Sequence, residues 1–393
     1  MTTADKAPAV SGQRAADLLI VGGGIMGLWA AVLAARAGLD TVLVERGRLG
    51  SGASGGLLGA LMPHMPDQWN DKKQFQFDAL VSLEAEIAAL EAETGLSAGY
   101  RRSGRIISLA KPHLRDIAIE RSDDAKRHWR SGDQSFAWHV LDEAVAPGWP
   151  EPSSMASGFV HDTLAGRVSP RALLRVLETA IRHSARVWII EGAAVRSLDG
   201  NRADLSDGET LTFGHAIVAA GVQSFPVLDR VLGVQGKSSG TAVKGQAALL
   251  KARLDPHMPV IFRDGLYIVP HEDGSVAVGS TSENTFDSPF TTDGQLDVLI
   301  ASARSLVPAL AEAPVFERWA GLRPKAIGRD PMVGAVPNHP SIVMLTGGFK
   351  VSFGLAHRLA AAAVGDVVGL VSDVPASFRT EAHIAVLVQK NPA

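Results

Sequence analysis

The chain has 393 residues, of which 46% are hydrophobic and 20% charged, a balance typical of a globular protein with a large buried core. Its net charge of −3, with both signs mixed, gives no electrostatic case for binding nucleic acid or an anionic membrane. The absence of cysteine excludes disulfides, cysteine-ligated metals, iron–sulfur clusters and a cysteinyl link to a cofactor. The 12 histidines show no metal-binding spacing, so no metal site is expected.

The first predicted elements are a strand, a glycine-rich turn, a helix and a second strand. The apolar run 18–21 precedes the hexapeptide 22–27 (GGGIMG), which fits the pattern G-x-G-x-x-G and opens an alanine-rich helix over 28–37. The strand 41–45 follows and ends on an acid, 18 residues past the last glycine of the turn. This order is typical of the βαβ unit that binds the ADP half of a dinucleotide. The three glycines also argue against a membrane span in this apolar region, and we expect a cytoplasmic protein.

Each position of the turn has a physical reason. Gly22 allows the tight turn, Gly24 lets the backbone approach a pyrophosphate, and Gly27 lets the helix pack close to the strand. The phosphates are expected at the helix N-terminus, where free N–H groups and the helix dipole favour anions. Glu45 is expected to accept hydrogen bonds from the adenosine ribose, and an acid there disfavours NADP. The loop 48–56 consists of small residues that let backbone N–H groups crowd a ligand.

The rest of the chain divides into two patterns. Helical periodicity predicts helices over 73–94, 170–183, 296–310 and 353–370. Buried strands typical of a parallel sheet are predicted over 186–190, 215–221 and 342–346. From 241 to 282 the pattern changes to short alternating strands with a hairpin at 272–274, which indicates a mostly antiparallel sheet. A strand is also predicted at 105–109, and residues 111–157 are predicted as mixed helix and loop.

Several segments, in this order, resemble the FAD-dependent amine and amino-acid oxidoreductases of the D-amino-acid oxidase superfamily, which includes glycine oxidase and sarcosine oxidase. The similar segments are 20–45, 50–54, 57–62, 218–221, 265–280, 320–324 and 346–354. Glycine oxidase is the nearest comparison, through 265–270 (GLYIVP) and 321–324 (GLRP).

The resemblance implies an α/β (α+β) fold in which a Rossmann-like FAD-binding domain is interleaved with a substrate domain built on a mixed, largely antiparallel sheet. We expect the FAD-binding domain to comprise 15–80, 160–235 and 324–385, and the substrate domain 81–159 and 236–323. The implied reaction transfers a hydride from an amine carbon to flavin N5 and leaves an imine that hydrolyses. Because the chain lacks cysteine, we expect FAD to be held non-covalently.

The resemblance also implies residues that act on a small amine or amino-acid substrate. Arg323 would hold a substrate carboxylate through two parallel hydrogen bonds. Tyr267 would reach the same carboxylate or close the pocket. Lys350, in the turn before the last long helix, would lie near the flavin and oppose the negative charge of its reduced form. His64 would line the pocket or transfer a proton.

A larger set of residues is implied to contact FAD. It consists of Gly22, Gly24, Ile25, Met26, Gly27, Glu45, Arg46, Ser51, Ala53, Ser54, Leu58, Gly59, Val195, Ala220, Gly221, Arg323, Gly348, Phe349, Lys350, Val351 and Ser352.

Several alternatives remain open at the level of the sequence. The enzyme is an oxidase that uses oxygen, an FAD-dependent dehydrogenase subunit of opine or amine type that passes electrons to a redox partner, or a tRNA-modifying amine oxidoreductase. The near-neutral charge argues against the last of these. An NAD-dependent dehydrogenase is the runner-up on the motif alone, but 241–282 does not resemble a nicotinamide-binding half. The substrate side chain, its chirality and any homo-oligomer also stay open.

Overall fold

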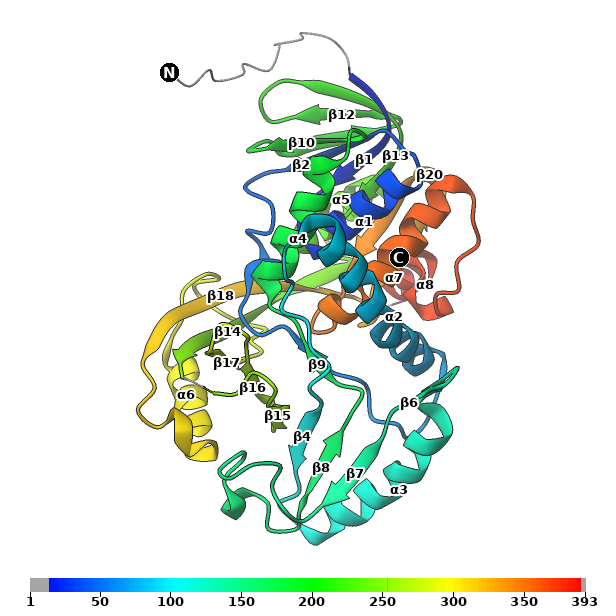
Figure 1. The fold of residues 1–393 in the computed structure, drawn as a ribbon. Helices are drawn as coiled ribbons and strands as arrows, with labels where there is room; N and C mark the ends of the chain where they lie inside the picture. The colour runs from blue at the N-terminus through cyan, green and yellow to red at the C-terminus, as the bar shows by residue number, and fades with distance from the viewer. Residues whose placement is uncertain (1–13, 253, 390–393) are drawn as a thin grey trace.

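Two eight-stranded sheets form the framework of the residues that the computed structural model describes, 14–252 and 254–389 (Figure 1). The strands of the first sheet are β10 (Val187–Glu191), β2 (Thr41–Glu45), β1 (Arg14–Val21), β13 (Thr210–Val218), β12 (Arg202–Leu205), β11 (Val195–Asp199), β20 (His339–Thr346) and β19 (Met332–Val336). Strands β10, β2, β1, β13 and β20 are parallel. The expected parallel sheet is therefore confirmed.

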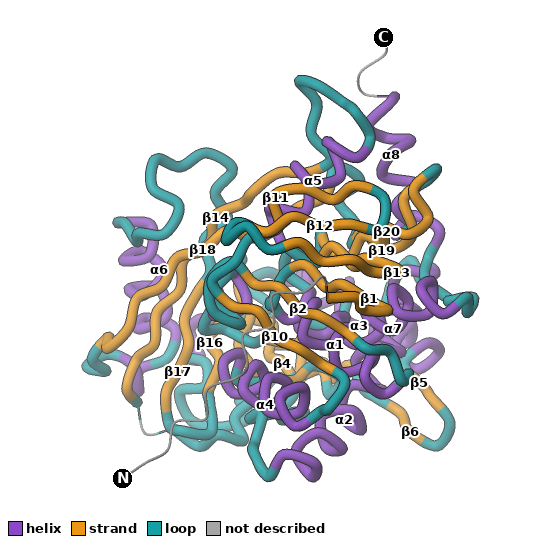
Figure 2. The backbone as a smooth tube through the Cα atoms, turned by 90° about the horizontal axis from the view of Figure 1, so that it is seen from above, coloured by secondary structure: helices purple, strands orange, loops and turns teal. Residues whose placement is uncertain are grey.

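The central parallel strands β1 and β2 are buried on both faces, as their continuous apolar runs predict, whereas the edge strand β10 is partly exposed. Leu18 and Ile20 of β1 pack against helices α1 (Ile25–Arg36), α4 (Pro170–His183) and α7 (Ser352–Val368). Leu19 and Val21 pack on the opposite face, against the antiparallel meander β11–β12–β13. Figure 2 shows the helices on one side of β1 and β2, and β11 and β12 on the other.

The second sheet lies below the first in Figure 1. Its strands, in spatial order, are β18 (Val315–Ala326), β14 (Gly240–Lys251), β17 (Ser275–Gly279), β16 (Leu266–Pro270), β15 (Val260–Arg263), β4 (Arg105–Ser108), β8 (Phe159–Asp162) and β7 (Trp138–Leu141). All neighbours are antiparallel except β15 and β4. The predicted turn at 272–274 joins β16 to β17, so the mixed, largely antiparallel sheet is also confirmed.

The remaining elements cover these sheets. Helix α2 (Asp71–Thr94) begins after Asn70, whose side chain accepts hydrogen bonds from two backbone N–H groups, and ends at Gly95 with φ of +70°. The other elements are β3 (Ala60–Leu61), α3 (Pro112–His128), β5 (Arg130–Ser131), β6 (Gln134–Ser135), β9 (Gly166–Arg167), α5 (Ser224–Val231), α6 (Gly294–Leu306) and α8 (Thr380–Gln389). Within the described ranges, no helix is both long and apolar enough to cross a membrane.

The structure differs from the sequence-based expectation in three strands of the second sheet. β7 lies inside the region 111–157, predicted as helix and loop, and neither β8 nor β18 was predicted as a strand. β7 and β8 have four residues each, too few for a clear alternation; β8 is stabilised by pairing with β4, and β7 by pairing with β8. β8 and β18 run across the expected domain boundaries at 159/160 and 323/324, and the domain division stays a prediction.

A buried histidine in α7 makes the stability of the fold depend on pH. His357 is 4% exposed, lies 2.9 Å from the Ser82 hydroxyl through Nε2, and packs against Trp29. Burial lowers its pKa to about 3, and the neighbouring charge of Arg358 adds to this effect. The folded protein therefore keeps this ring neutral at a pH where the unfolded chain protonates it.

We expect the stability that depends on neutral His357 to be complete above about pH 6.5 and to be lost as the pH falls towards 3. Between pH 7 and pH 5 the natural chain should lose roughly 2 kcal/mol more of its unfolding free energy than His357→Gln does. Urea unfolding of both proteins at the two pH values measures this difference. Equal losses would contradict the prediction.

Candidate active site

A cavity of about 650 Å³ lies between the two sheets, at the carboxyl ends of β1, β2 and β13. Its walls come from the glycine turn after β1, the loop 51–60, residues 193–196 and 219–223, and the turn before α7. The second sheet contributes side chains of β14, β16 and β18. Ligands of open α/β sheets bind at this end of the strands, and the volume is that of a small-molecule or cofactor site.

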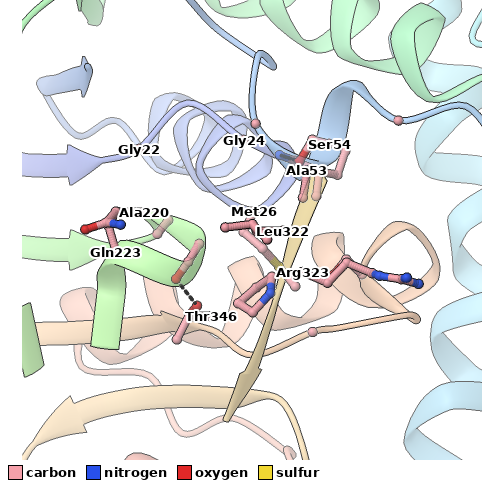
Figure 3. Close-up of a pocket in the computed structure, with 18 of the residues that line it drawn as sticks. Gly22, Gly24, Met26, Ala53, Ser54, Ala220, Gln223, Leu322, Arg323 and Thr346 are labelled. Atoms are coloured by element: carbon pink, nitrogen blue, oxygen red, sulfur yellow. Dashed lines mark hydrogen bonds between the residues drawn. The ribbon is translucent and has the colours of Figure 1, made fainter. Parts of the chain in front are cut away.

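The glycine turn forms a close-packed end of this cavity. Gly22 has φ of +107°, and a Cβ there would lie 2.6 Å from the Ala219 carbonyl oxygen. A Cβ on Gly27 would lie 1.9 Å from the Gly22 carbonyl oxygen, so helix and strand approach each other more closely than any side chain allows. The Ser54 hydroxyl accepts from the N–H of Ile25 at 3.0 Å and ties the small-residue loop to the start of α1 (Figure 3).

Glu45 shapes the neighbouring part of the wall. Its two carboxylate oxygens accept hydrogen bonds from the N–H groups of Gly23 at 2.8 Å and Gly47 at 2.9 Å. The carboxylate therefore holds the turn after β1 against the turn after β2, and its remaining lone pairs are available to hydroxyl donors. Arg46 and Val195 line the cavity beside Glu45.

Arg323 projects from β18 into the opposite end of the cavity (Figure 3). Its guanidinium donates to the Ser280 hydroxyl at 3.1 Å and to the Thr281 carbonyl, while its buried Nε–H has no partner within the described residues. Burial lowers the pKa of Arg323 to about 10, against the opposing effects of Tyr267 and Glu283. The residue is still a cation at neutral pH, with donor capacity to spare for an anion.

A network of polar groups, most of them buried, holds the backbone that carries Ser280 and Thr281, the hydrogen-bond acceptors of Arg323. Lys244 forms ion pairs with Glu283 at 3.3 Å and with Asp293 at 3.0 Å. Gln246 donates to Glu283 at 2.9 Å, and Thr281 also donates to this carboxylate. Because these groups form hydrogen bonds and ion pairs with one another, they orient Arg323 without neutralising its charge.

Tyr267 lies on β16 and lines the cavity, and its ring is 4.8 Å from that of Phe262. No hydrogen bond to its hydroxyl is present among the described residues. Burial raises the pKa of this hydroxyl, although the charges of Arg105 and Arg323 oppose the shift. The phenol is thus a neutral donor at physiological pH.

The turn before α7 closes the cavity on a third side. Phe349 has φ of +46°, and Lys350 follows it with its side chain exposed. The surrounding protein lowers the pKa of Lys350 by removing water, and the charge of Arg323 lowers it further. The Thr346 hydroxyl donates to the Gly221 carbonyl at 3.0 Å and joins this turn to the end of β13 (Figure 3).

The structure brings almost all of the expected site residues to this one cavity. Two do not line it: Gly27, which packs between α1 and β1, and His64. His64 is an exposed residue on the loop between β3 and α2, where its backbone N–H donates to Gln76. We propose no catalytic role for it.

Other lining residues were not among the candidates from the sequence. They include Gln223, Ser280, Phe290, Trp319, Leu322 and Thr346. Leu322, Ser280 and Thr346 belong to segments that resemble the family and could have been inferred from them, whereas Gln223, Phe290 and Trp319 carry no local signal and depend on how the two sheets meet.

The lining residues fit an adenine dinucleotide. The glycine turn leaves no room for side chains where a pyrophosphate would approach, Glu45 has free lone pairs for a ribose, and the cavity extends from there to an arginine with an unused donor. Gly24 precedes α1 and has no side chain to cap it, and Ser54 accepts only from the N–H of Ile25, which leaves the other N–H groups of the first turn open to an anion. The fold and the site therefore define a dinucleotide-dependent enzyme with a second sheet that covers the reactive end.

Residues 17–362 match the model of the family described as FAD dependent oxidoreductase (DAO). The chain belongs to this family and is an FAD-dependent oxidoreductase. A glycine oxidase from Pseudomonas aeruginosa is 29% identical over 349 residues, which cover 85% of this chain and 89% of that protein.

Two solved structures show the same fold. The crystal structure of glycine oxidase from Geobacillus kaustophilus superposes with a TM-score of 0.82 at 22% identity, covering 94% of this chain and 99% of that one. The structure of L-proline dehydrogenase from P. horikoshii superposes with a TM-score of 0.80 at 14% identity, covering 95% and 99%.

Proposed function

We propose that this enzyme oxidises the C–N bond of a small amine or amino acid that carries a carboxylate. The observation that carries the proposal is Arg323, a half-buried cation that faces the cavity, has no carboxylate partner within the described residues and keeps a buried N–H free. The curated relative named glycine oxidase, which matches over most of both chains, supports the same reaction class.

In this proposal Arg323 holds the substrate carboxylate and the Tyr267 hydroxyl donates a further hydrogen bond to it. Lys350 and the N-terminal end of α7 face the end of the cavity where negative charge develops. FAD, when bound, supplies the hydride acceptor. The residues of the chain thus bind the substrate, orient it and exclude water.

The residues that line the cavity indicate whether the substrate amine reacts in its protonated or its neutral form. Within the part of the chain that the structure describes, the cavity is lined by one acidic residue, Glu45, and by no histidine. Glu45 lies at the glycine-turn end, remote from Arg323 in the proposed arrangement. No side chain beside Arg323 is therefore suited to act as a general base, and the two cations there favour the neutral form of the amine. We expect kcat/KM to rise with pH until the amine is deprotonated.

The test is anaerobic reduction of the purified, FAD-loaded enzyme by a panel of amines: glycine, sarcosine, proline, D- and L-amino acids and opines. Bleaching of the visible flavin band by a carboxylated amine is the expected result. A flavin that none of these compounds reduces would contradict the proposal.

The same preparation separates the oxidase from the dehydrogenase. Rapid reoxidation of the reduced flavin by oxygen would identify an oxidase. Slow reaction with oxygen but rapid reaction with an artificial acceptor would identify a dehydrogenase that depends on a redox partner.

A further inference from the structure

Three cations surround one aromatic ring at the edge of the cavity. The ring of Phe349 lies 5.6 Å from the guanidinium of Arg323, 5.9 Å from the ammonium of Lys325 and 5.7 Å from that of Lys350. We call these three residues and Phe349 the Phe349 cation cluster. Each cation is within cation–π distance of the ring, so no two of them are more than about 12 Å apart.

No carboxylate neutralises this cluster. Among the described residues, none of its three cations forms an ion pair. Glu283, whose charge acts on Arg323, pairs with Lys244, as does Asp293. Asp330, which follows β18, pairs with Lys72. Three like charges gathered without counterions repel one another, and a bound anion relieves that repulsion.

Two of these cations have a role in the proposed function and the third has none. Arg323 is assigned to one substrate carboxylate and Lys350 to the negative charge that develops at the cofactor. Lys325 is two residues past Arg323 on β18, so both side chains leave the same face of the strand. Lys325 is not itself a lining residue, but its flexible side chain ends beside Phe349, which does line the cavity.

We propose that the Phe349 cation cluster selects a substrate with a second carboxylate, so that the preferred substrate is a small amino acid or secondary amine bearing two carboxylates. This inference rests on the proposed function and narrows its substrate class. One carboxylate binds to Arg323, and the other lies within the field of Lys325, whose ammonium is also within cation–π distance of the Phe349 ring. The charges of Arg323 and Lys325 are at most about 12 Å apart, and a small dicarboxylate with an ion-pair contact of about 3 Å at each end can cover that span.

The experiment compares two unreactive ligands of equal chain length, butyrate with one carboxylate and succinate with two. Each is titrated into the FAD-loaded enzyme at low ionic strength, and Kd is read from the shift of the flavin absorption spectrum. We expect succinate to bind about tenfold more tightly than butyrate, and Lys325→Met to reduce this preference to within about threefold. Lys251→Met, which removes an exposed charge at the far end of β14, is the matched control and should keep the full preference.

Equal Kd values for the two ligands, or an undiminished preference in Lys325→Met, would overturn the inference. A second comparison uses turnover: the ratio of kcat/KM for iminodiacetate to that for sarcosine should fall about tenfold in Lys325→Met. Reduction of the flavin by glycine without any preference for succinate would leave the proposed function standing and refute only the second carboxylate. A preference for succinate in an enzyme that no amine reduces would refute the proposed reaction and keep the anion site.

Discussion

Replacing Arg323 with alanine is expected to lower kcat/KM for a carboxylated amine by about 100-fold, mainly through KM. The variant removes a charged donor pair from a partly buried site, and such a loss costs on the order of 3 kcal/mol of binding free energy. The effect should fall mainly on the substrate, because Arg323 is only one of the residues implied to contact FAD and the glycine turn and Glu45 are unchanged in the variant. Steady-state kinetics and the flavin content of the purified variant measure both parts of this prediction.

Arg318 provides the control on the same strand. It forms a surface ion pair with Asp297, where 41% and 58% of the two side chains are exposed, so Arg318→Ala should change kcat/KM less than twofold. Arg323→Lys keeps the charge but loses the planar donor pair, and an intermediate loss is expected. Undiminished bleaching by the same amine in Arg323→Ala would show that the carboxylate binds elsewhere.

Gly27→Ala is expected to give a protein with at least tenfold less bound FAD after gel filtration. The new Cβ would lie 1.9 Å from the backbone oxygen of Gly22 and 3.4 Å from Ile20, and a clash with backbone cannot be relieved by rotating a side chain. Helix α1 must move away from β1, and its N-terminal end then leaves the position that an anion requires. The absorbance ratio of flavin to protein and the thermal unfolding temperature report the two consequences.

Gly294→Ala is the matched control for this change. Gly294 begins α6, and a Cβ there meets nothing within 4 Å, so this variant should retain its flavin and its stability. A Gly27→Ala protein that purifies with a full complement of FAD would refute the assignment of the glycine turn to the cofactor.

Elements specified by interactions between neighbouring residues were predicted from the sequence, whereas some strands that pair with distant segments were not. The β1–α1–β2 unit, helices α2, α4 and α7 and the β16–β17 hairpin appear where the sequence predicts them, because each is specified by local periodicity and by its own turn residues. Among the strands that were missed, β8 pairs with β4 and β18 with β14, and in both pairs the two strands are far apart in the sequence. The hairpin β11–β12 was missed as well, although only two residues join its strands. β18 pairs with β14 along almost its whole length, although more than 60 residues separate them in the sequence.

The candidate active site likewise contains residues that the sequence predicts and residues that only the tertiary structure brings together. From its residues alone, the chain determined the glycine turn, the acid that follows it and the absence of a cysteinyl link to the cofactor, since these depend on spacing and composition. Only the tertiary structure decided that His64 lies outside the cavity and that Phe290 and Trp319 line it. The tertiary structure also decided that Lys325 and Lys350, which lie on different elements, meet at one aromatic ring. The packing of sheets brings charges on separate elements together, and no local sequence pattern indicates such an arrangement.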